Sequence, residues 1–178
     1  MTKVIGIGLQ RTGTTSLYHA LNELGIKSAP DSIPLFYNRD FSFLGKYDAF
    51  MDNPIPLLYQ QIDEHIDDCK FILTTRTKSS WLKSVEWLFN KEMKNLNSRL
   101  RKVADDIHFE FYGTTKFDST IFSRKWDDYH QGVVEHFRYR QKDLLVFKID
   151  QNPNWGPICS FLDKPIPKIA FPYLNKSK

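Results

Sequence analysis

The fold class of this chain follows from one N-terminal stretch, Lys3-Val-Ile-Gly-Ile-Gly-Leu-Gln-Arg-Thr-Gly-Thr-Thr-Ser-Leu17. Its first residues are mostly apolar and β-branched, which favours a buried strand. The glycine- and hydroxyl-rich residues that follow predict a turn that opens a helix. Gly8 and Gly13 keep the glycine spacing of the ATP-type loop G-x-x-x-x-G-K-[ST], but Thr14 occupies the lysine position. The stretch therefore predicts a strand, a phosphate-binding loop and a helix, with a departure from the loop of ATPases.

The predicted loop is rich in groups that bind anions. The backbone N–H groups of residues 12–16 can point into the loop, at the positive end of the following helix. Its side chains add a cation and several hydroxyls around a glycine, and we predict that the residues that hold phosphate are Arg11, Thr12, Gly13, Thr14, Thr15 and Ser16. The alternative is a threonine-rich turn with no ligand. We favour the anion site because glycine spacing, hydroxyls, cation and helix all agree.

Composition limits the class of protein. The length of 178 residues and the 41% hydrophobic content predict one domain, residues 1–178, with a real core. A net charge of +4 suits an anionic ligand but is too small to indicate nucleic acid. Cys69 and Cys159 fit no metal-ligand spacing and are expected to pack as reduced thiols. We find no apolar run of membrane-spanning length and no signal peptide pattern, so we expect a soluble, cytoplasmic protein.

Strand and helix patterns alternate along the chain, which predicts an α/β fold. We expect a three-layer, P-loop NTPase-like arrangement with a mainly parallel, about five-stranded central sheet flanked by helices. The expected strands are residues 4–7, 26–29, 47–52, 70–75 and 144–149. The first expected helix stops at Gly25, and the others cover about 57–66, a stretch that begins at Ser79 or Ser80, 123–140 and 155–162. Residues 30–46 are predicted to be irregular with a little helix, and residues 90–125 are the least readable.

Three polar residues end three expected strands. Arg11, Asp52 and Arg76 follow different strands, and the carboxyl ends of parallel strands form the ligand-binding edge of an open sheet. Ser84 lies eight residues after Arg76, so a guanidinium and a hydroxyl can hold one phosphate from two sides. The alternatives are a salt bridge for Arg76 and a tolerated small residue for Ser84. Coupled to the loop, the pair favours ligand binding.

With these motifs the chain resembles the sulfotransferase family, whose enzymes use 3′-phosphoadenosine 5′-phosphosulfate. The family loop, approximately K-S-G-T-T, is matched by Arg11–Thr15, and its arginine and serine eight positions apart are matched by Arg76 and Ser84. The resemblance is closer to a short branch with G-L-x-R-T-G-T-T-S-L, K-x-I-L-T-x-R and W-x-x-S. It spans nearly the whole chain, including Phe171-Pro-Tyr-Leu-Asn175 near its end.

The resemblance implies transfer of a sulfuryl group from this nucleotide to an acceptor hydroxyl or amine on a small molecule, glycan or protein. The product would be adenosine 3′,5′-bisphosphate, and the family needs no metal. Arg11 and the loop amides would stabilise the bridging oxygen, while Arg76 and Ser84 would select the 3′-phosphate. Asp52 is our first candidate for the general base and His130 the reserve, although the family often uses histidine or glutamate. The competing interpretation of Asp52 is a cap on the turn at Asn53.

Two other functions remain open at the level of sequence. A P-loop kinase acting on nucleotides or small molecules shares such a sheet, but it needs the Walker lysine that Thr14 replaces. A nucleotide-binding module without catalytic activity would keep the loop and lose the chemistry. The short chain, which leaves little material for an acceptor site, lends weight to that second alternative.

Overall fold

The chain forms two compact units, Met1–Arg76 with Tyr139–Lys178 and Thr77–Arg138. The computed structural model describes residues 2–174. The first unit contains the sheet with its helices, and the second consists of helices. That one domain comprises both units stays a prediction.

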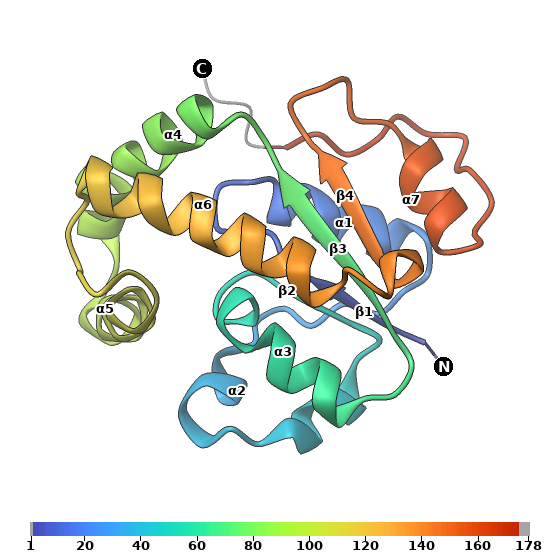
Figure 1. Ribbon diagram of the computed structural model, residues 1–178, viewed down its shortest axis with the longest axis horizontal. Helices are drawn as coiled ribbons and strands as arrows, with labels where there is room; N and C mark the ends of the chain where they lie inside the picture. The colour runs from blue at the N-terminus through green and yellow to red at the C-terminus, as the bar shows by residue number, and fades with distance from the viewer. Residues whose placement is uncertain (1, 175–178) are drawn as a thin grey trace. The chain divides into compact units, whose positions relative to one another are not determined.

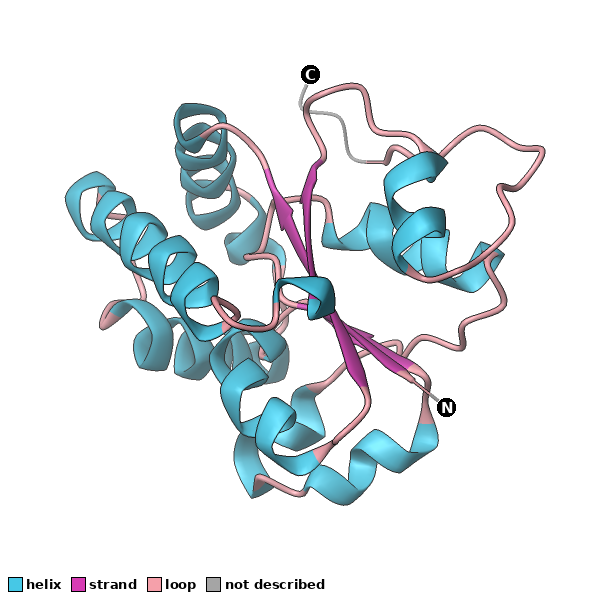
Figure 2. Ribbon diagram, turned by 45° about the vertical axis from the view of Figure 1, so that its right-hand side comes forward, coloured by secondary structure: helices cyan, strands magenta, loops and turns pink. Residues whose placement is uncertain are grey.

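A four-stranded sheet of the order β2-β1-β3-β4 forms the centre of the first unit, and every pairing is parallel (Figures 1 and 2). The strands are β1 Lys3–Gly6, β2 Ala49–Met51, β3 Cys69–Thr75 and β4 Leu144–Lys148. Ile5 of β1 pairs with Phe50 on one side and Phe71 on the other. The chain runs from β1 to β2 and then returns past β1 to β3. The order therefore reverses between β1 and β3, where open α/β sheets bind their ligands.

The α/β class and the parallel sheet are confirmed, but the expected fifth strand is wrong. Residues 26–29 form only an isolated bridge, in which Ser28 pairs with Ala49. Asp48 N–H donates to Lys27 O over 2.8 Å, and Ala29 N–H donates to Ala49 O over 2.9 Å. Pro30 follows directly and has no N–H to continue the ladder. The segment thus lies along β2 without becoming a strand.

Helices cover both faces of the sheet, which gives the three layers expected (Figure 2). The helical elements of this unit are α1 Thr14–Glu23, α2 Ile33–Asn38, η1 Phe41–Lys46, α3 Ile55–His65, η3 Gln141–Asp143 and α7 Trp155–Phe161. In both views α1 and α7 lie on one face and α3 on the other. Gly25, with φ +74°, ends the first helix as expected. The α3 helix starts at Ile55, earlier than expected, because proline is tolerated in a first helical turn.

The face that carries α1 is closed by one apolar cluster. Leu17 and Leu21 of α1 pack with Val4, Ile72 and other buried residues: Ile26, Ala49, Met51, Phe147, Ile149 and Ile158. Gly6 allows this approach, since a Cβ there would lie 2.7 Å from the Met51 Cβ and 2.9 Å from Leu17 Cδ2. The cluster fixes the start of α1 against the sheet.

The second unit is helical throughout its regular structure. Its elements are α4 Lys78–Asn90, η2 Glu92–Asn95, α5 Ser98–Tyr112 and α6 Ser119–His136. The α6 helix begins and ends earlier than the expected 123–140, because Asp118 caps it by accepting from Thr120 N–H and Ile121 N–H. Residues that we could not interpret from sequence form α5, which Asn97 caps at its start and Gly113 ends with φ +73°.

Candidate functional site

The loop after β1 is built on close contact with β3. Ile7 N–H donates to Ile72 O over 2.9 Å, which extends the pairing beyond the strand. Gly8 then passes so near Thr74 that a Cβ would lie 1.8 Å from Thr74 Oγ1 and 2.6 Å from its carbonyl oxygen. Only glycine fits this position without displacement of the neighbouring strand. The first glycine of the predicted loop is therefore a packing requirement.

The Thr12 side chain holds the loop in shape. It is fully buried, and its hydroxyl donates to Leu9 O over 2.5 Å. Its oxygen also lies 2.8 Å from Thr74 Oγ1, and its backbone N–H donates to Leu9 O over 3.1 Å. Thr12 was predicted to hold phosphate, and in the structure its hydroxyl and its N–H make bonds inside the fold. Sequence reasoning missed Thr74, although it lies in the motif that ends at Arg76.

The second loop glycine leads into α1. Gly13 has φ +95°, and a Cβ there would lie 2.6 Å from Ile149 Cγ1, just after β4. Leu17 N–H donates to Gly13 O over 3.0 Å, so the helical ladder begins at that carbonyl. The N–H groups at the start of a helix have no acceptor within the helix, and they carry its positive partial charge. Residues 14–16 thus have the geometry of an anion site.

The two predicted arginines meet at this edge of the sheet. Arg11 is half-buried and adopts φ +69°, a left-handed backbone that is uncommon outside glycine. Its carbonyl oxygen accepts from Arg76 Nη1 over 3.4 Å. The Arg76 side chain therefore contacts the backbone of the loop that leads into α1, whose N-terminus carries a positive partial charge.

Asp52 ends β2 at the same edge, also in a left-handed conformation, with φ +64°. Its Oδ1 accepts from Asn53 N–H over 2.9 Å, and its backbone oxygen accepts from Ile55 N–H over 2.8 Å. Asp52 thus does cap the turn before α3, as the competing interpretation expected. Because left-handed residues other than glycine tend to gather at functional sites, the backbone at Arg11 and Asp52 is a second mark of this edge.

The environment of the Asp52 carboxyl combines opposing effects. The side chain is exposed, yet the surrounding protein displaces enough water to raise its pKa above the ordinary value. Hydrogen bonds from Asn53 N–H and the Thr14 hydroxyl lower the pKa, and so does the charge of Arg11. Thr14 is therefore bonded to the candidate base. A carboxylate with a raised pKa and solvent access is suited to accept a proton.

Two amide side chains join β2 to the loop. Asn53 Nδ2 donates to Gln10 Oε1, which ties the turn after β2 to the residue before Arg11. Gln10 is buried. Because Asn53 follows Asp52 and Gln10 precedes Arg11, the bond links the backbone at Asp52 to the backbone at Arg11. Sequence reasoning did not identify this pair, because the two residues stand 43 positions apart and Gln10 occupies an unspecified position of the loop motif.

The remaining predicted loop residues differ in exposure. Thr15 is exposed on the first turn of α1, whereas Ser16 is fully buried. The Ser16 hydroxyl oxygen accepts from Leu174 N–H over 2.9 Å, so this side chain contacts the C-terminal segment. The roles of both residues toward phosphate stay predictions.

Two predicted residues belong to the second unit. Ser84 is buried on α4, and its pairing with Arg76 around one phosphate stays a prediction. His130 on α6 packs its ring 3.9 Å from the Trp126 ring, and its Nδ1 lies 2.8 Å from Trp126 O. Burial lowers the pKa of His130. Its surroundings are those of a packed imidazole.

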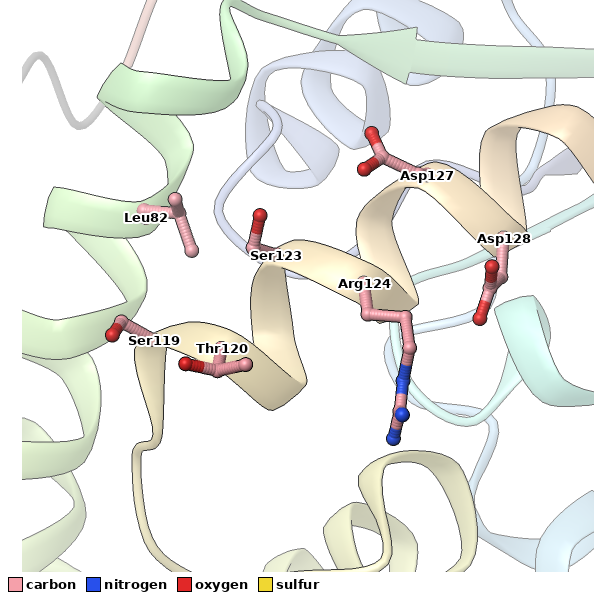
Figure 3. A pocket seen from close by; sticks show the side chains of 7 residues that line it. All are labelled: Leu82, Ser119, Thr120, Ser123, Arg124, Asp127 and Asp128. Atoms are coloured by element: carbon pink, nitrogen blue, oxygen red, sulfur yellow. The ribbon is translucent and has the colours of Figure 1, made fainter.

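The second unit also has an open pocket of about 550 Å³ lined by residues of α4 and α6 (Figure 3). One face of α6 supplies most of its lining, and the residues are Leu82, Ser119, Thr120, Ser123, Arg124, Asp127 and Asp128. Lys78 forms an ion pair of 2.6 Å with Asp127 at this pocket. This pocket could not be predicted from the sequence, because a helix face of hydroxyls and charges is typical of a solvated surface.

The described residues contain neither a cluster of metal ligands nor a membrane-spanning helix. Within residues 2–174, no three His, Cys, Asp or Glu side chains lie close enough together to hold a metal ion. No helix of that same range has the length and apolar character needed to cross a bilayer. Cys69 and Cys159 are free, buried thiols.

Comparisons with known proteins agree with the motifs at this edge. A family model described as "Sulfotransferase domain" matches residues 3–43 and 35–178. The chain is also similar to the Ava biosynthesis cluster protein M of Aspergillus versicolor, with 28% identity over 212 residues. That alignment covers 98% of this chain and 81% of the relative. The family match includes the loop after β1, the end of β3 and the C-terminal segment.

Proposed function

Because this chain belongs to the sulfotransferase domain family, we propose that it transfers a sulfuryl group from 3′-phosphoadenosine 5′-phosphosulfate to an acceptor hydroxyl or amine. The observation that carries the proposal is the bond from Arg76 Nη1 to the carbonyl oxygen of Arg11. It ties the guanidinium at the end of β3 to the backbone of the loop that leads into α1. Arg11 supplies a second cation from that loop, and a donor with phosphates at both the 3′ and 5′ positions needs two positive centres.

The donor supplies a sulfuryl group already activated by its bond to the 5′-phosphate. Arg11 and the N–H groups of residues 14–16 bind that phosphate and stabilise the charge that develops on its bridging oxygen. Arg76 binds the 3′-phosphate together with Ser84. An arginine suits either site, because its planar guanidinium makes paired hydrogen bonds to phosphate oxygens.

Asp52 takes the proton from the acceptor group. Its pKa is raised by the protein around it, so the carboxylate is a stronger base than an ordinary aspartate. The Thr14 hydroxyl donates to it and fixes its orientation. The family often uses histidine or glutamate here, so the assignment of Asp52 is specific to this chain and requires its own test.

The acceptor class is open among small molecules, glycans and proteins. The printed name of the A. versicolor relative places that protein in a biosynthesis cluster. This name supports a screen that begins with small-molecule alcohols, phenols and amines.

Calorimetry tests the donor. We expect adenosine 3′,5′-bisphosphate to bind without divalent metal, and ATP with magnesium to bind much more weakly. Arg76→Ala should weaken bisphosphate binding roughly ten- to a hundredfold, the effect of losing a charged hydrogen bond. Lys142→Ala is the control, since it removes the same charge from an exposed residue in η3, just before β4. A preference for ATP with magnesium would overturn the proposal in favour of a kinase.

A transfer assay separates an enzyme from a binding module. The protein is incubated with donor labelled in its sulfuryl group and with the acceptor panel, and labelled product is counted. Transfer by the wild type that is lost in Asp52→Asn supports an enzyme. Bisphosphate binding without transfer to any acceptor class would indicate a module that retains only the binding site.

A further inference from the structure

The segment after α7 is fastened to the core of the first unit although it has no helix or strand. The Trp155 indole N–H donates to Ile169 O over 2.7 Å. The Phe171 ring lies edge-on to the Trp155 ring, with centroids 5.2 Å apart, and 5.5 Å from the ring of Phe147 in β4. Tyr173 packs against the apolar cluster that surrounds Leu17. The path of this segment is therefore set by burial and by specific bonds.

The segment ends on the first turn of α1. Leu174 N–H donates to Ser16 Oγ over 2.9 Å, and the same hydroxyl lies 3.5 Å from Leu174 O. The side chain of Ser16 is fully buried. Its oxygen is thus occupied by the backbone of a residue 158 positions away. Thr15, one residue earlier, is exposed and open to a ligand.

We propose that residues 169–174, which we call the C-terminal strap, are a positioning element of the donor site, with Ser16 as their anchor. The inference rests on the proposed function, because it assigns the donor phosphate to the N–H groups of residues 14–16. The strap itself does not touch the phosphate. It holds the turn that does.

The physical reason is the weakness of a first helical turn. Its N–H groups make no bonds within the helix, so the turn frays unless side chains hold it. Leu17 N–H, bonded to Gly13 O at 3.0 Å, is the first link of the ladder. A bond from the strap to Ser16 restrains this turn before a ligand arrives. Donors that are already oriented bind more tightly, because less conformational freedom is lost.

A matched pair of variants at one position isolates the bond. Leu174→Pro removes the N–H that donates to Ser16, whereas Leu174→Ala keeps it and changes only the side chain. We expect Leu174→Pro to weaken bisphosphate binding about five- to tenfold, the usual effect of one hydrogen bond, and Leu174→Ala to change it less than about twofold. Equal affinities for the two variants would overturn the inference.

A double variant separates a strap anchor from a direct phosphate ligand. If Ser16 acts through the strap, Ser16→Ala and Leu174→Pro each weaken binding, and the double variant is no weaker than either alone. If the Ser16 hydroxyl binds phosphate itself, Ser16→Ala weakens binding and Leu174→Pro does not. That second pattern would overturn the strap as a positioning element.

Hydrogen exchange without ligand keeps the test independent of the donor. The amides of residues 17–20 should exchange faster in Leu174→Pro than in Leu174→Ala, while those of β3 stay protected in both. Unchanged exchange in α1 would overturn the inference even if the donor binds as proposed. A folded wild type that fails to bind the bisphosphate would overturn the proposed function, and exchange alone would then decide on the strap.

Discussion

Thr12 Oγ1 lies 2.8 Å from Thr74 Oγ1, and this pair of buried hydroxyls joins the loop after β1 to the adjacent strand β3. Each hydroxyl has one proton. Because the Thr12 proton is donated to Leu9 O, the Thr74 hydroxyl is the donor between the two threonines. The loop is therefore held by a short chain of hydrogen bonds that runs from β3 through Thr12 to its own backbone.

Replacing Thr74 with valine keeps the shape of the side chain and removes that donor. We expect Thr74→Val to lower the free energy of unfolding by about 1 kcal/mol and to weaken bisphosphate binding, because the Thr12 oxygen loses its buried partner. Thr120→Val is the control, since it removes a hydroxyl from an exposed threonine of α6. Denaturant unfolding and calorimetry measure both effects. Identical results for the two valine variants would show that the hydroxyl pair is dispensable.

The close approach of Gly8 to Thr74 predicts that one added methyl group lowers the free energy of unfolding more than Thr74→Val does. In Gly8→Ala the new Cβ would meet Thr74 at distances that no relaxed side chain permits. We expect a loss of about 3 kcal/mol in the free energy of unfolding, the upper range for an overpacked core. Gly45→Ala should change it by less than about 0.5 kcal/mol, because nothing lies within 4 Å of a Cβ at that position. Similar denaturation midpoints for the two variants would contradict the close approach of the loop to β3.

Asp52 gives a prediction for catalysis and its pH dependence. Asp52→Asn keeps a residue that accepts left-handed backbone, and it should lower the transfer rate at least roughly a hundredfold if the carboxylate is the base. Since the surrounding protein displaces water from the Asp52 carboxyl and raises its pKa, the rate should fall on acidification at a pH above the ordinary 3.8. Thr14→Val removes a hydrogen bond that lowers this pKa, so the fall should move to higher pH.

The control for this experiment is Thr15→Val, which removes a neighbouring exposed hydroxyl that is not among the groups that shift the Asp52 pKa. Its rate profile should keep the wild-type position on the pH axis. If Asp52→Asn transfers at the wild-type rate, Asp52 only caps the turn at Asn53, and the base lies elsewhere.

His108 predicts how the second unit responds to acid. Burial lowers the pKa of His108 to about 4, since its ring lies 4.6 Å from that of Phe89 in an apolar setting, with Asp105 and Arg101 as the charged groups that act on it. The unfolded chain takes up the proton near 6.5, and the folded chain does so only near 4. His108 therefore does not lower the free energy of unfolding above about pH 6.5. As the pH falls from 6.5 toward 4, the free energy of unfolding decreases by up to about 3 kcal/mol.

His108→Leu should remove most of this acid sensitivity, and His136→Gln, in the same unit, should retain it. Trp81, Trp87 and Trp126 belong to this unit and Trp155 to the other. Tryptophan fluorescence during denaturant unfolding at several pH values therefore reports mainly on the second unit. If the denaturant midpoint of the wild type does not change between pH 7 and pH 5, His108 does not make the second unit sensitive to acid.

Local patterns in the sequence predicted the parts of the fold that local physics determines. Gly8, Gly13 and the β-branched residues around them indicated the strand, loop and helix, and Arg76 was placed correctly at the end of a strand. The expected strand at 26–29 is wrong, because Pro30 follows its apolar residues directly and has no N–H to continue the ladder. The start of α5 was missed, although Asn97 and Gly113 carry ordinary capping signals.

The contacts that shape the site could not be predicted in this way. Thr12 with Thr74, Asn53 with Gln10 and Ser16 with Leu174 join positions that lie 62, 43 and 158 residues apart. Their side chains are common polar types, and only the order of the strands brings them together. A single sequence contains the residues of such pairs but not their pairing.

The contacts of Gly13 with Ile149 and of Ser16 with Leu174 also bear on the order of events during synthesis. The loop is translated long before the strand and the segment that complete it, and during that interval it lacks its neighbours. Long-range contacts of this kind form late in folding, because the intervening chain must first be ordered. A nascent chain released or stalled before β4 would therefore contain the whole glycine-rich motif and still be unable to recognise the nucleotide.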